Sequence, residues 1–497
     1  MEKQQLPTLN RNLLQGEDGA LADAAGNSPI TVLQIGEGNF LRGFVDWMLH
    51  ECRKQGRYAG SIAVTQPRPS GRPKIEALTR QDGLYTLVTR GLVNGEPTES
   101  REIISSFREA LDPYAEWERF LAIAESPELQ LVVSNTTEAG LRYVPEELVE
   151  GQPLAGYPAK AAYLLYRRFE RYAGAADRGL VFLPCELLER NGDELLRCVL
   201  QHSEAWGLPD AFRDWVKQHN RFINSLVDRI VTGHPGEQQA EAWFTEWGYR
   251  DSMVNTAEPY HFWAIEAEDE LGGMLPLRAA GLNVVWTQDL KPYQTRKVRI
   301  LNGAHTLMTP LALLNGLESV RETMNHADLS AFVRETVRAD IIPVLSMEAN
   351  ELHAYADSVF ERFLNPFIHH RLADIAMNTI SKFRTRLLPT IEAYGERGEQ
   401  VPDRLAYAVT GLLRYYRVKR TDSGEYAGQR FDGKAYQVRD DAGMLAILEE
   451  EWHAAEGSSP VARLLGRTEL WGSDLTKLPG LVEKVEQYLT GWERANG

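Results

Sequence analysis

The sequence predicts an α/β domain followed by a mainly helical domain, at residues 25–288 and 289–497 respectively. Three observations lead to this fold class. Short apolar runs alternate with helical stretches in the N-terminal part, which is the pattern of βαβ units. One of these runs ends in a glycine-rich turn. After Asn302, strand signals almost vanish and apolar residues recur with the period of a helix.

The N-terminal apolar runs are predicted to be strands of a parallel sheet. Four of them have the length and composition of buried strands: Ile30–Ile35, Ser61–Gln66, Leu129–Ser134 and Leu180–Leu183. Phe44–Cys52 and Ala115–Ala124 are predicted to be helices between them. Leu84–Arg90 alternates between apolar and polar residues, so it is predicted as an antiparallel excursion. A last strand at 283–288 places the domain boundary near Val284–Pro292.

The C-terminal part carries four long stretches with helical periodicity, at 305–314, 329–345, 372–388 and 405–418. Arg414, Arg417, Lys419 and Arg420 alternate with tyrosines in and just after the last of these stretches, which predicts a solvated surface helix. The basic residues of the third stretch have a single acid nearby, Asp374.

Composition restricts the class of partner. The chain of 497 residues has a net charge of −16, which argues against nucleic acid or an anionic membrane as the main partner. Three cysteines are too few for a disulfide framework, and their spacing fits no zinc template. No apolar run of about 18 residues and no leader-type N-terminus is present, so a cytoplasmic enzyme without a membrane span is expected.

The glycine-rich turn is the first candidate site. It reads Gly36-Glu37-Gly38-Asn39-Phe40-Leu41-Arg42-Gly43, after a strand and before a helix. In that position glycines let the backbone approach a dinucleotide pyrophosphate, although an ordinary tight turn has the same local sequence. The end of the second strand reads Thr65-Gln66-Pro67-Arg68 and lacks the acid that usually binds the adenosine ribose. By itself, Arg68 favours NADP, unless it is a solvated loop residue.

The second candidate site is a lysine, an asparagine and a histidine in one predicted helical segment. On an α-helix, Asn302 lies roughly 140° and His305 roughly 80° around from Lys297, so the three side chains share one broad side. Oxidation of a secondary alcohol needs a base for the hydroxyl proton and donors for the developing alkoxide. A partly buried lysine amine can be that base. The alternative is a solvated helix entry with a histidine in the core.

Lys297-x4-Asn302-x2-His305 resembles the catalytic signature of the mannitol dehydrogenase family, the polyol-specific long-chain dehydrogenases. Further segments match in order along nearly the whole chain: Gly36-x-Gly38-x-Phe40-x-Arg42, 135–140, Asn191-Gly192, 224–229, Glu258-Pro259 and Asn365-Pro366. The resemblance implies a Rossmann-type N-terminal domain, a mainly helical C-terminal domain, NAD as cofactor and no metal.

The resemblance also implies roles for individual residues. Lys297 is the expected general acid/base, Asn302 part of the oxyanion site, and His305 and Asp228 substrate ligands. The expected cofactor ligands are Gly36, Gly38, Asn39, Phe40, Arg42, Asn135 and Thr136. Leu187 stands where an oxyanion-donating asparagine is expected, so Asn191 is assigned that task and counted with the substrate-binding residues.

Within the family, residues 35–47, 184–193 and 296–306 are most similar to the branch that interconverts D-tagaturonate and D-altronate. The expected substrate is therefore an acidic sugar, and Lys382 is the expected basic ligand, with Arg371, Arg384 and Arg386 in the same region. Reduction of fructuronate and oxidation of a neutral polyol such as mannitol are the alternatives within the family. A catalytically silent nucleotide-binding regulator, or an epimerase that retains its NAD, is the alternative from another class.

Overall fold

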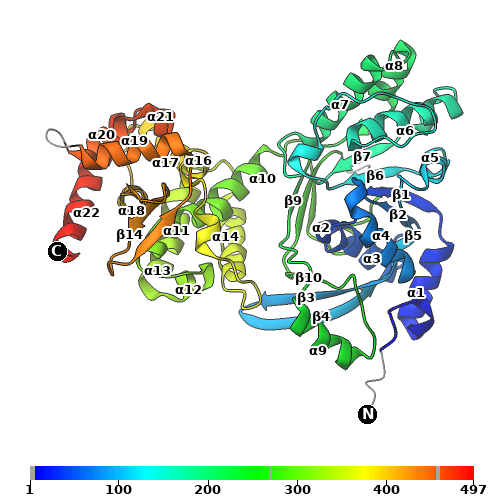
Figure 1. Ribbon diagram of the computed structural model, residues 1–497, viewed down its shortest axis with the longest axis horizontal. Coiled ribbons are helices and arrows are strands. Elements are labelled where there is room, and N and C mark those ends of the chain that lie inside the picture. The colour runs from blue at the N-terminus through cyan, green and yellow to red at the C-terminus, as the bar shows by residue number, and fades with distance from the viewer. Residues whose placement is uncertain (1–5, 269–270, 272, 455–458, 497) are drawn as a thin grey trace. The chain divides into compact units, whose positions relative to one another are not determined.

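The computed structural model describes residues 6–268, 271, 273–454 and 459–496. The chain divides into two compact units (Figure 1). The first contains Met1–Arg90 and Thr98–Leu290, and the second contains Gly91–Pro97 and Lys291–Gly497. The domain boundary expected near Val284–Pro292 stays a prediction.

A six-stranded parallel sheet forms the centre of the first unit. Its strands are β1 (Ile30–Ile35), β2 (Ser61–Thr65), β5 (Phe107–Leu111), β6 (Leu131–Ser134), β7 (Val181–Pro184) and β8 (Arg221–Phe222). They lie in the order β5-β2-β1-β6-β7-β8, with every pairing parallel. Numbered by appearance in this sheet, the order is 3-2-1-4-5-6, which is that of the Rossmann fold. The predicted fold class is confirmed.

The register of the sheet aligns three strand ends. Ile35, the last residue of β1, is paired with Thr65 of β2 and with Ser134 of β6. The segments that begin at Gly36, Gln66 and Asn135 therefore emerge side by side at the carboxyl edge. Between β1 and β6 the strand order reverses, and open α/β sheets bind their ligands at such a switch point.

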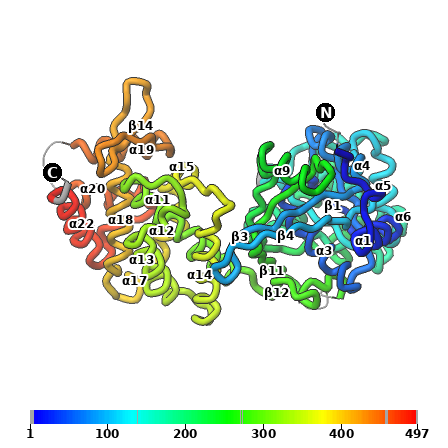
Figure 2. The backbone as a smooth tube through the Cα atoms, turned by 90° about the horizontal axis from the view of Figure 1, so that it is seen from below, coloured from blue at the N-terminus to red at the C-terminus, as the bar shows by residue number. Residues whose placement is uncertain are grey.

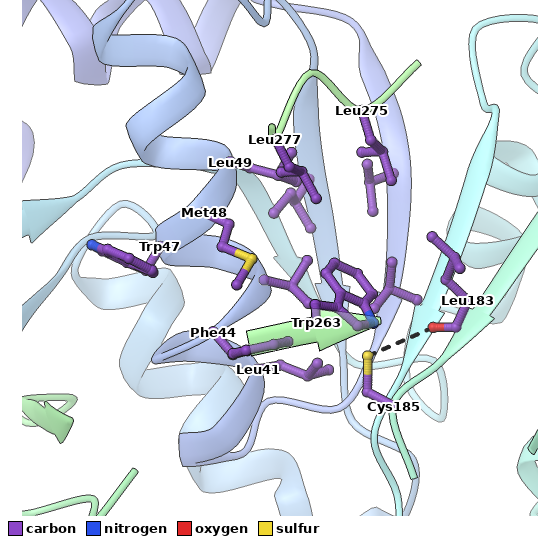
Figure 3. Packing of buried hydrophobic residues seen from close by; sticks show 14 of the residues in the cluster. Leu41, Phe44, Trp47, Met48, Leu49, Leu183, Cys185, Trp263, Leu275 and Leu277 are labelled. Carbon is purple, nitrogen blue, oxygen red and sulfur yellow. Dashed lines mark hydrogen bonds between the residues drawn. The ribbon is translucent and has the colours of Figure 1, made fainter. Parts of the chain in front are cut away.

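Helices cover both faces of this sheet, as Figure 1 shows. The helices of the first unit are α1 (Gly16–Asn27), α2 (Asn39–Arg42), α3 (Val45–Lys54), α4 (Arg72–Arg80), α5 (Trp117–Ala124), α6 (Tyr157–Arg171), α7 (Asn191–Ala205), α8 (Asp210–His219) and α9 (Glu237–Trp247). On one face, Phe44 and Met48 pack with Trp263 in a continuous apolar core (Figure 3). On the other face, Leu33 and Val132 pack with Phe120. Because both faces are covered, the central strands β1, β2, β6 and β7 are buried almost throughout.

Two smaller sheets complete the first unit. One has the order β10-β3-β4, with β3 (Tyr85–Val93), β4 (Glu96–Ile104) and β10 (Asn255–Ala257). The other has the order β12-β11-β9, with β9 (Ser225–Asp228), β11 (Phe262–Glu266) and β12 (Val284–Thr287). The prediction of an antiparallel excursion at 84–90 was incomplete: β3 turns back into β4 through Asn94-Gly95, but on its other side it pairs with β10 in parallel.

The second unit is built around α11 (Gly303–Leu314), which is buried along its whole length and contacts α12, α13, α15, α16 and α18. The other helices are α10 (Lys291–Arg296), α12 (Val320–Asn325), α13 (Ala327–Glu335), α14 (Ala349–Phe363), α15 (Leu372–Ile375), α16 (Thr379–Arg386), α17 (Leu388–Glu396), α18 (Asp403–Tyr415), α19 (Ala442–His453), α20 (Pro460–Gly466), α21 (Thr468–Trp471) and α22 (Leu481–Asn496). In the described part of the chain, no helix combines the length and the apolar character needed to cross a membrane.

Strand structure does not vanish after Asn302. A three-stranded antiparallel sheet is formed by β13 (Lys419–Arg420), β14 (Tyr426–Gln429) and β15 (Ala435–Val438), and Figure 2 shows it extending beyond α19. The surface helix predicted through Arg420 was therefore wrong beyond Tyr415, where α18 ends. Tyr415 and Tyr416 are buried, and the Tyr436 ring of β15 stacks on Tyr415 at 5.0 Å between ring centroids.

Candidate active site

The glycine turn after β1 has a backbone that only glycine adopts readily. Gly36 has a φ of 135°, and a Cβ atom there would lie 2.9 Å from the carbonyl oxygen of Asn135. Gly38 has an ordinary φ of −67°, but a Cβ atom built on it would meet nothing within 4 Å. Gly36 thus brings the ends of β1 and β6 together, while Gly38 borders open space.

The helix predicted at 44–52 is present as α3, and an additional single turn, α2, directly follows the glycines. The chain bends at Phe44 between α2 and α3. A Cβ atom on Gly43 would lie 2.8 Å from Val231 Cγ1, so the third glycine of the motif is required for packing. Any contact of this turn with a phosphate therefore depends on individual backbone N–H groups rather than on a long helix dipole.

A cavity of about 330 Å³ lies at the switch point of the sheet. Its walls come from the three aligned strand ends: Gly36, Glu37, Gly38, Pro67, Arg68, Ser70, Gly71, Lys74, Asn135, Thr136 and Thr137. A second cavity, of about 620 Å³, shares Pro67, Arg68, Ser70 and Thr136 with it. Four of the seven predicted cofactor ligands, Gly36, Gly38, Asn135 and Thr136, therefore line the first cavity.

The other three predicted cofactor ligands are Asn39, Phe40 and Arg42, and they are not among the described residues that line it. Arg42 is buried, and its guanidinium donates to the carbonyl oxygen of Glu37 at 3.3 Å and to Asn39 Oδ1 at 2.8 Å. Phe40 stacks on Phe44. Arg42 thus stabilises the turn through hydrogen bonds, and Phe40 packs against the residue that follows the motif. A direct contact of Asn39, Phe40 or Arg42 with a cofactor stays a prediction.

Glu186 fixes the wall that β6 contributes. Its carboxylate accepts hydrogen bonds from the Thr136 backbone N–H at 2.9 Å, Thr136 Oγ1 at 3.1 Å and Ser134 Oγ at 3.1 Å. Burial raises the pKa of Glu186, and these hydrogen bonds oppose the increase. Glu186 was not selected from the sequence, because its role depends on the pairing of β6 with β7.

Asn191 and Asp228 are both buried in the first unit. The Asn191 amide donates to the carbonyl oxygens of Pro184, Glu186 and Ser225, and its own oxygen accepts from the backbone N–H groups of Gly192 and Ser225. In this arrangement Asn191 connects the loop after β7 to β9. Its predicted role as a substrate ligand, like that of Asp228, stays a prediction, and Asn191 would have to exchange one of these bonds.

The second unit brings Lys297, Asn302 and His305 onto one continuous helical segment with an unusual middle part. Residues Lys297–Asn302 form a π-helix between α10 and α11. In a π-helix the hydrogen bonds connect residues five apart, so Asn302 lies one turn beyond Lys297. This differs from the separation of roughly 140° expected for an α-helix. Lys297 is half-buried, as the predicted role of its amine requires.

His305 lies in a strongly basic environment. Its ring packs on Phe363 and on His370, with centroid separations of 4.5 and 4.8 Å. Burial lowers the pKa of His305 well below its usual value, and the positive charges of His370, Arg386, Arg362 and Lys382 lower it further. His305 is therefore neutral at pH 7. Among the described residues, its buried Nε2 atom has no hydrogen-bond partner.

Lys382 and Arg386 belong to this basic cluster, which also includes Arg362 and His370. Lys382 Nζ donates to the carbonyl oxygen of Ile375 at 2.8 Å, and Arg386 donates to Thr306 Oγ1 at 3.4 Å. Burial lowers the pKa of both side chains. The helix predicted over 372–388 is broken at Asn378, whose left-handed backbone separates α15 from α16. The break allows α16 to place two cations near His305.

Both parts of this chain match domains of known proteins. Residues 30–278 match the mannitol dehydrogenase Rossmann domain, and residues 289–492 match the mannitol dehydrogenase C-terminal domain. The altronate oxidoreductase of Bacillus subtilis (strain 168) is 41% identical over 463 residues, covering 93% of this chain and 92% of that protein. The altronate oxidoreductase of Yersinia enterocolitica is 39% identical over 490 residues and 97% of both chains.

Two solved structures share the fold. A D-sorbitol dehydrogenase in substrate-free form superposes with a TM-score of 0.77 at 20% identity, covering 95% of each chain. The Pseudomonas fluorescens mannitol 2-dehydrogenase, solved as a ternary complex with NAD and D-mannitol, gives a TM-score of 0.64 at 22% identity, over 95% of this chain and 93% of that one.

The first unit also fits a dinucleotide on its own geometry. Its cavity lies at the switch point, is bordered by a glycine that leaves open space, and has a wall fixed by buried hydrogen bonds. In the part of the chain that the structure describes, no group of three or more His, Cys, Asp or Glu is arranged to hold a metal ion. The chain belongs to the mannitol dehydrogenase family and is an NAD-dependent oxidoreductase that acts on a secondary alcohol.

Proposed function

We propose that this enzyme interconverts D-tagaturonate and D-altronate with NAD(H). The observation that carries the proposal is the basic cluster around His305, because a uronate differs from a neutral ketose by a carboxylate that needs cationic partners. Relatives named altronate oxidoreductase, about 40% identical over more than nine-tenths of the chain, support the same substrate.

Lys297 is proposed as the general acid/base. In the oxidative direction its neutral amine takes the proton of the reacting hydroxyl, and in the reductive direction its ammonium form returns a proton to the carbonyl oxygen. Asn302, one π-helical turn away, donates a hydrogen bond to the same oxygen as negative charge develops there. The nicotinamide of the bound cofactor supplies the acceptor or donor of the hydride. Neutral His305 uses Nε2 to orient a substrate hydroxyl.

The substrate carboxylate is assigned to the cations of the basic cluster. Arg386 presents a planar guanidinium, which binds a carboxylate through two hydrogen bonds, and Lys382 adds a point charge one helical turn away. The acidic charge of the whole chain disfavours an anionic substrate at long range, so a concentrated local set of cations is needed.

Arg386→Leu is expected to lower kcat/KM for tagaturonate about 100-fold, because loss of a buried charged partner costs a few kcal/mol and each 1.4 kcal/mol is about tenfold. The kcat/KM for fructose, which has no carboxylate, is expected to change less than about threefold. Steady-state kinetics on both ketoses measure this. Arg384→Leu, an exposed arginine on the same helix, is the matched control. Equal losses on both ketoses would show that Arg386 supports the fold and not the carboxylate.

The substrate itself is tested by NADH consumption with tagaturonate, fructuronate and fructose. The proposal expects the highest kcat/KM for tagaturonate. Faster reduction of fructuronate would assign the enzyme to the other uronate, and dominant reduction of fructose would remove the role of the basic cluster. Absence of any turnover would favour a silent nucleotide-binding protein.

We also propose a cytoplasmic location, since Cys52, Cys185 and Cys198 are all free thiols.

A further inference from the structure

The adenosine end of the cofactor site lacks its usual acid. In Rossmann domains an acid after the second strand binds the ribose 2′-hydroxyl and selects NAD. Here β2 is followed by Gln66, whose side-chain amide donates to Asp112 Oδ1 at 2.7 Å. Asp112 is not among the described residues lining the cavity. The selection of NAD therefore has to come from another group.

Glu37 brings a carboxylate to the same place from the glycine turn. A Cβ atom on Gly71 would lie 2.7 Å from Glu37 Oε1 and 2.5 Å from Gln66 Cβ, so the Glu37 carboxylate is beside the residue that ends β2. Only 7% of Glu37 is exposed, and it is the sole acid among the described lining residues. Gly71 is the residue whose missing side chain makes room for it.

The two cations of the cavity are already engaged. Lys74 Nζ lies 3.7 Å from Glu37 Oε1, and Arg68 Nη2 donates to Thr137 Oγ1 at 3.0 Å. A 2′-phosphate placed here would have to compete with Glu37 for Lys74 and would meet a carboxylate of like charge. The preference for NADP that Arg68 suggests in the sequence is therefore opposed by the Glu37 carboxylate.

We propose that the Glu37 carboxylate accepts a hydrogen bond from the adenosine ribose 2′-hydroxyl and repels a 2′-phosphate, and so selects NAD over NADP. The glycine turn then has two functions. Gly36 and Gly38 leave space for the pyrophosphate of the cofactor, and Glu37 between them binds the ribose. This inference concerns the cofactor alone and does not depend on the identity of the sugar.

The test is equilibrium binding without any sugar present. Glu37→Gln keeps the size of the side chain and removes its charge. Fluorescence titration with NADH and NADPH, and calorimetry with ADP-ribose and its 2′-phosphate, report the affinity for each ribose. We expect the Kd for NADH and ADP-ribose to rise about tenfold. The Kd for NADPH and for ADP-ribose 2′-phosphate is expected to fall about tenfold, so the selectivity for NADH over NADPH changes about 100-fold.

Glu76→Gln is the matched control, because Glu76 is an exposed acid on α4 that pairs with Arg72 and does not line the cavity. It removes the same charge and is expected to leave the selectivity unchanged. Thermal unfolding of both variants verifies that the fold is retained. An unchanged ratio of the NADH and NADPH affinities in Glu37→Gln, or an equal shift in Glu76→Gln, would overturn the proposal. Gly71→Ala supplies a second variant: its Cβ displaces the Glu37 carboxylate and is expected to lower the same ratio.

Discussion

Lys297→Ala is expected to lower kcat about 10³-fold in both directions, because no other described side chain is proposed to pass the proton of the reacting oxygen. The Kd for NADH is expected to change less than about twofold, since Lys297 lies outside the first unit, which forms the dinucleotide cavity. Stopped-flow turnover and NADH fluorescence titration on the same preparation measure the two quantities.

Lys291→Ala is the matched control for this experiment. Lys291 is an exposed lysine at the start of α10, six residues before Lys297, and its alanine variant is expected to retain at least half of the wild-type kcat. If Lys297→Ala kept a near wild-type rate, the assignment of the general acid/base would be wrong. If it lost NADH binding in parallel with turnover, the lysine would act on the cofactor site instead.

Gly36→Ala is expected to have the second large effect, on stability and cofactor binding together. A φ of 135° is strained for alanine, and the added Cβ would lie 2.9 Å from a backbone oxygen of Asn135 that the sheet holds in place. We expect the free energy of unfolding to fall by about 2–3 kcal/mol. Because the ends of β1 and β6 are pushed apart, the Kd for NADH is expected to rise about 100-fold. Chemical denaturation and fluorescence titration measure these changes.

Gly38→Ala separates folding from binding. Its backbone is ordinary and its Cβ meets nothing within 4 Å, so stability is expected to stay within about 0.5 kcal/mol of wild type. The new methyl group occupies the open space at the cavity, and NADH binding is expected to weaken at least tenfold. Unimpaired binding by Gly38→Ala would mean that the dinucleotide does not approach this turn.

Local sequence was sufficient to find four of the six strands of the central sheet and the glycine turn, whereas β5 and β8 were not predicted. A parallel strand covered on both faces is a mainly apolar run, and four of the six residues in Ile30–Ile35 are apolar. The hairpin at Asn94-Gly95 was not predicted, although Asn-Gly is a strong sequence signal for a two-residue turn. In the structure both residues adopt the positive φ that such a turn requires. The short strands β13–β15 were hidden because each has only two to four residues, most of which are exposed or half-exposed.

The chemical surroundings of each candidate residue were less accessible from sequence. Lys382 was selected for its charge, but the association of Arg362, His370 and Arg386 with His305 depends on tertiary contacts between segments far apart in the sequence. Glu37 was visible within the glycine motif, but its proximity to the end of β2 follows from strand register. The spacing of Lys297, Asn302 and His305 gave the residues but not the π-helical geometry.

The π-helical turn determines the angle of Lys297 around the helix axis relative to the helix that follows. A π-turn holds one residue more than the α-turn it replaces, and this form is rarely stable unless its surroundings enforce it. Deletion of one residue between Val298 and Leu301 would let the segment relax to regular α-helix, with a local gain in hydrogen-bond geometry. The same deletion would leave Lys297 and His305 at about the same angle around the helix axis, because the wider π-turn already accommodates the extra residue. Relaxation to regular α-helix without a deletion would instead rotate Lys297 by about 100° relative to His305 on the buried helix that follows. The surroundings that enforce the π-turn therefore keep these two side chains aligned.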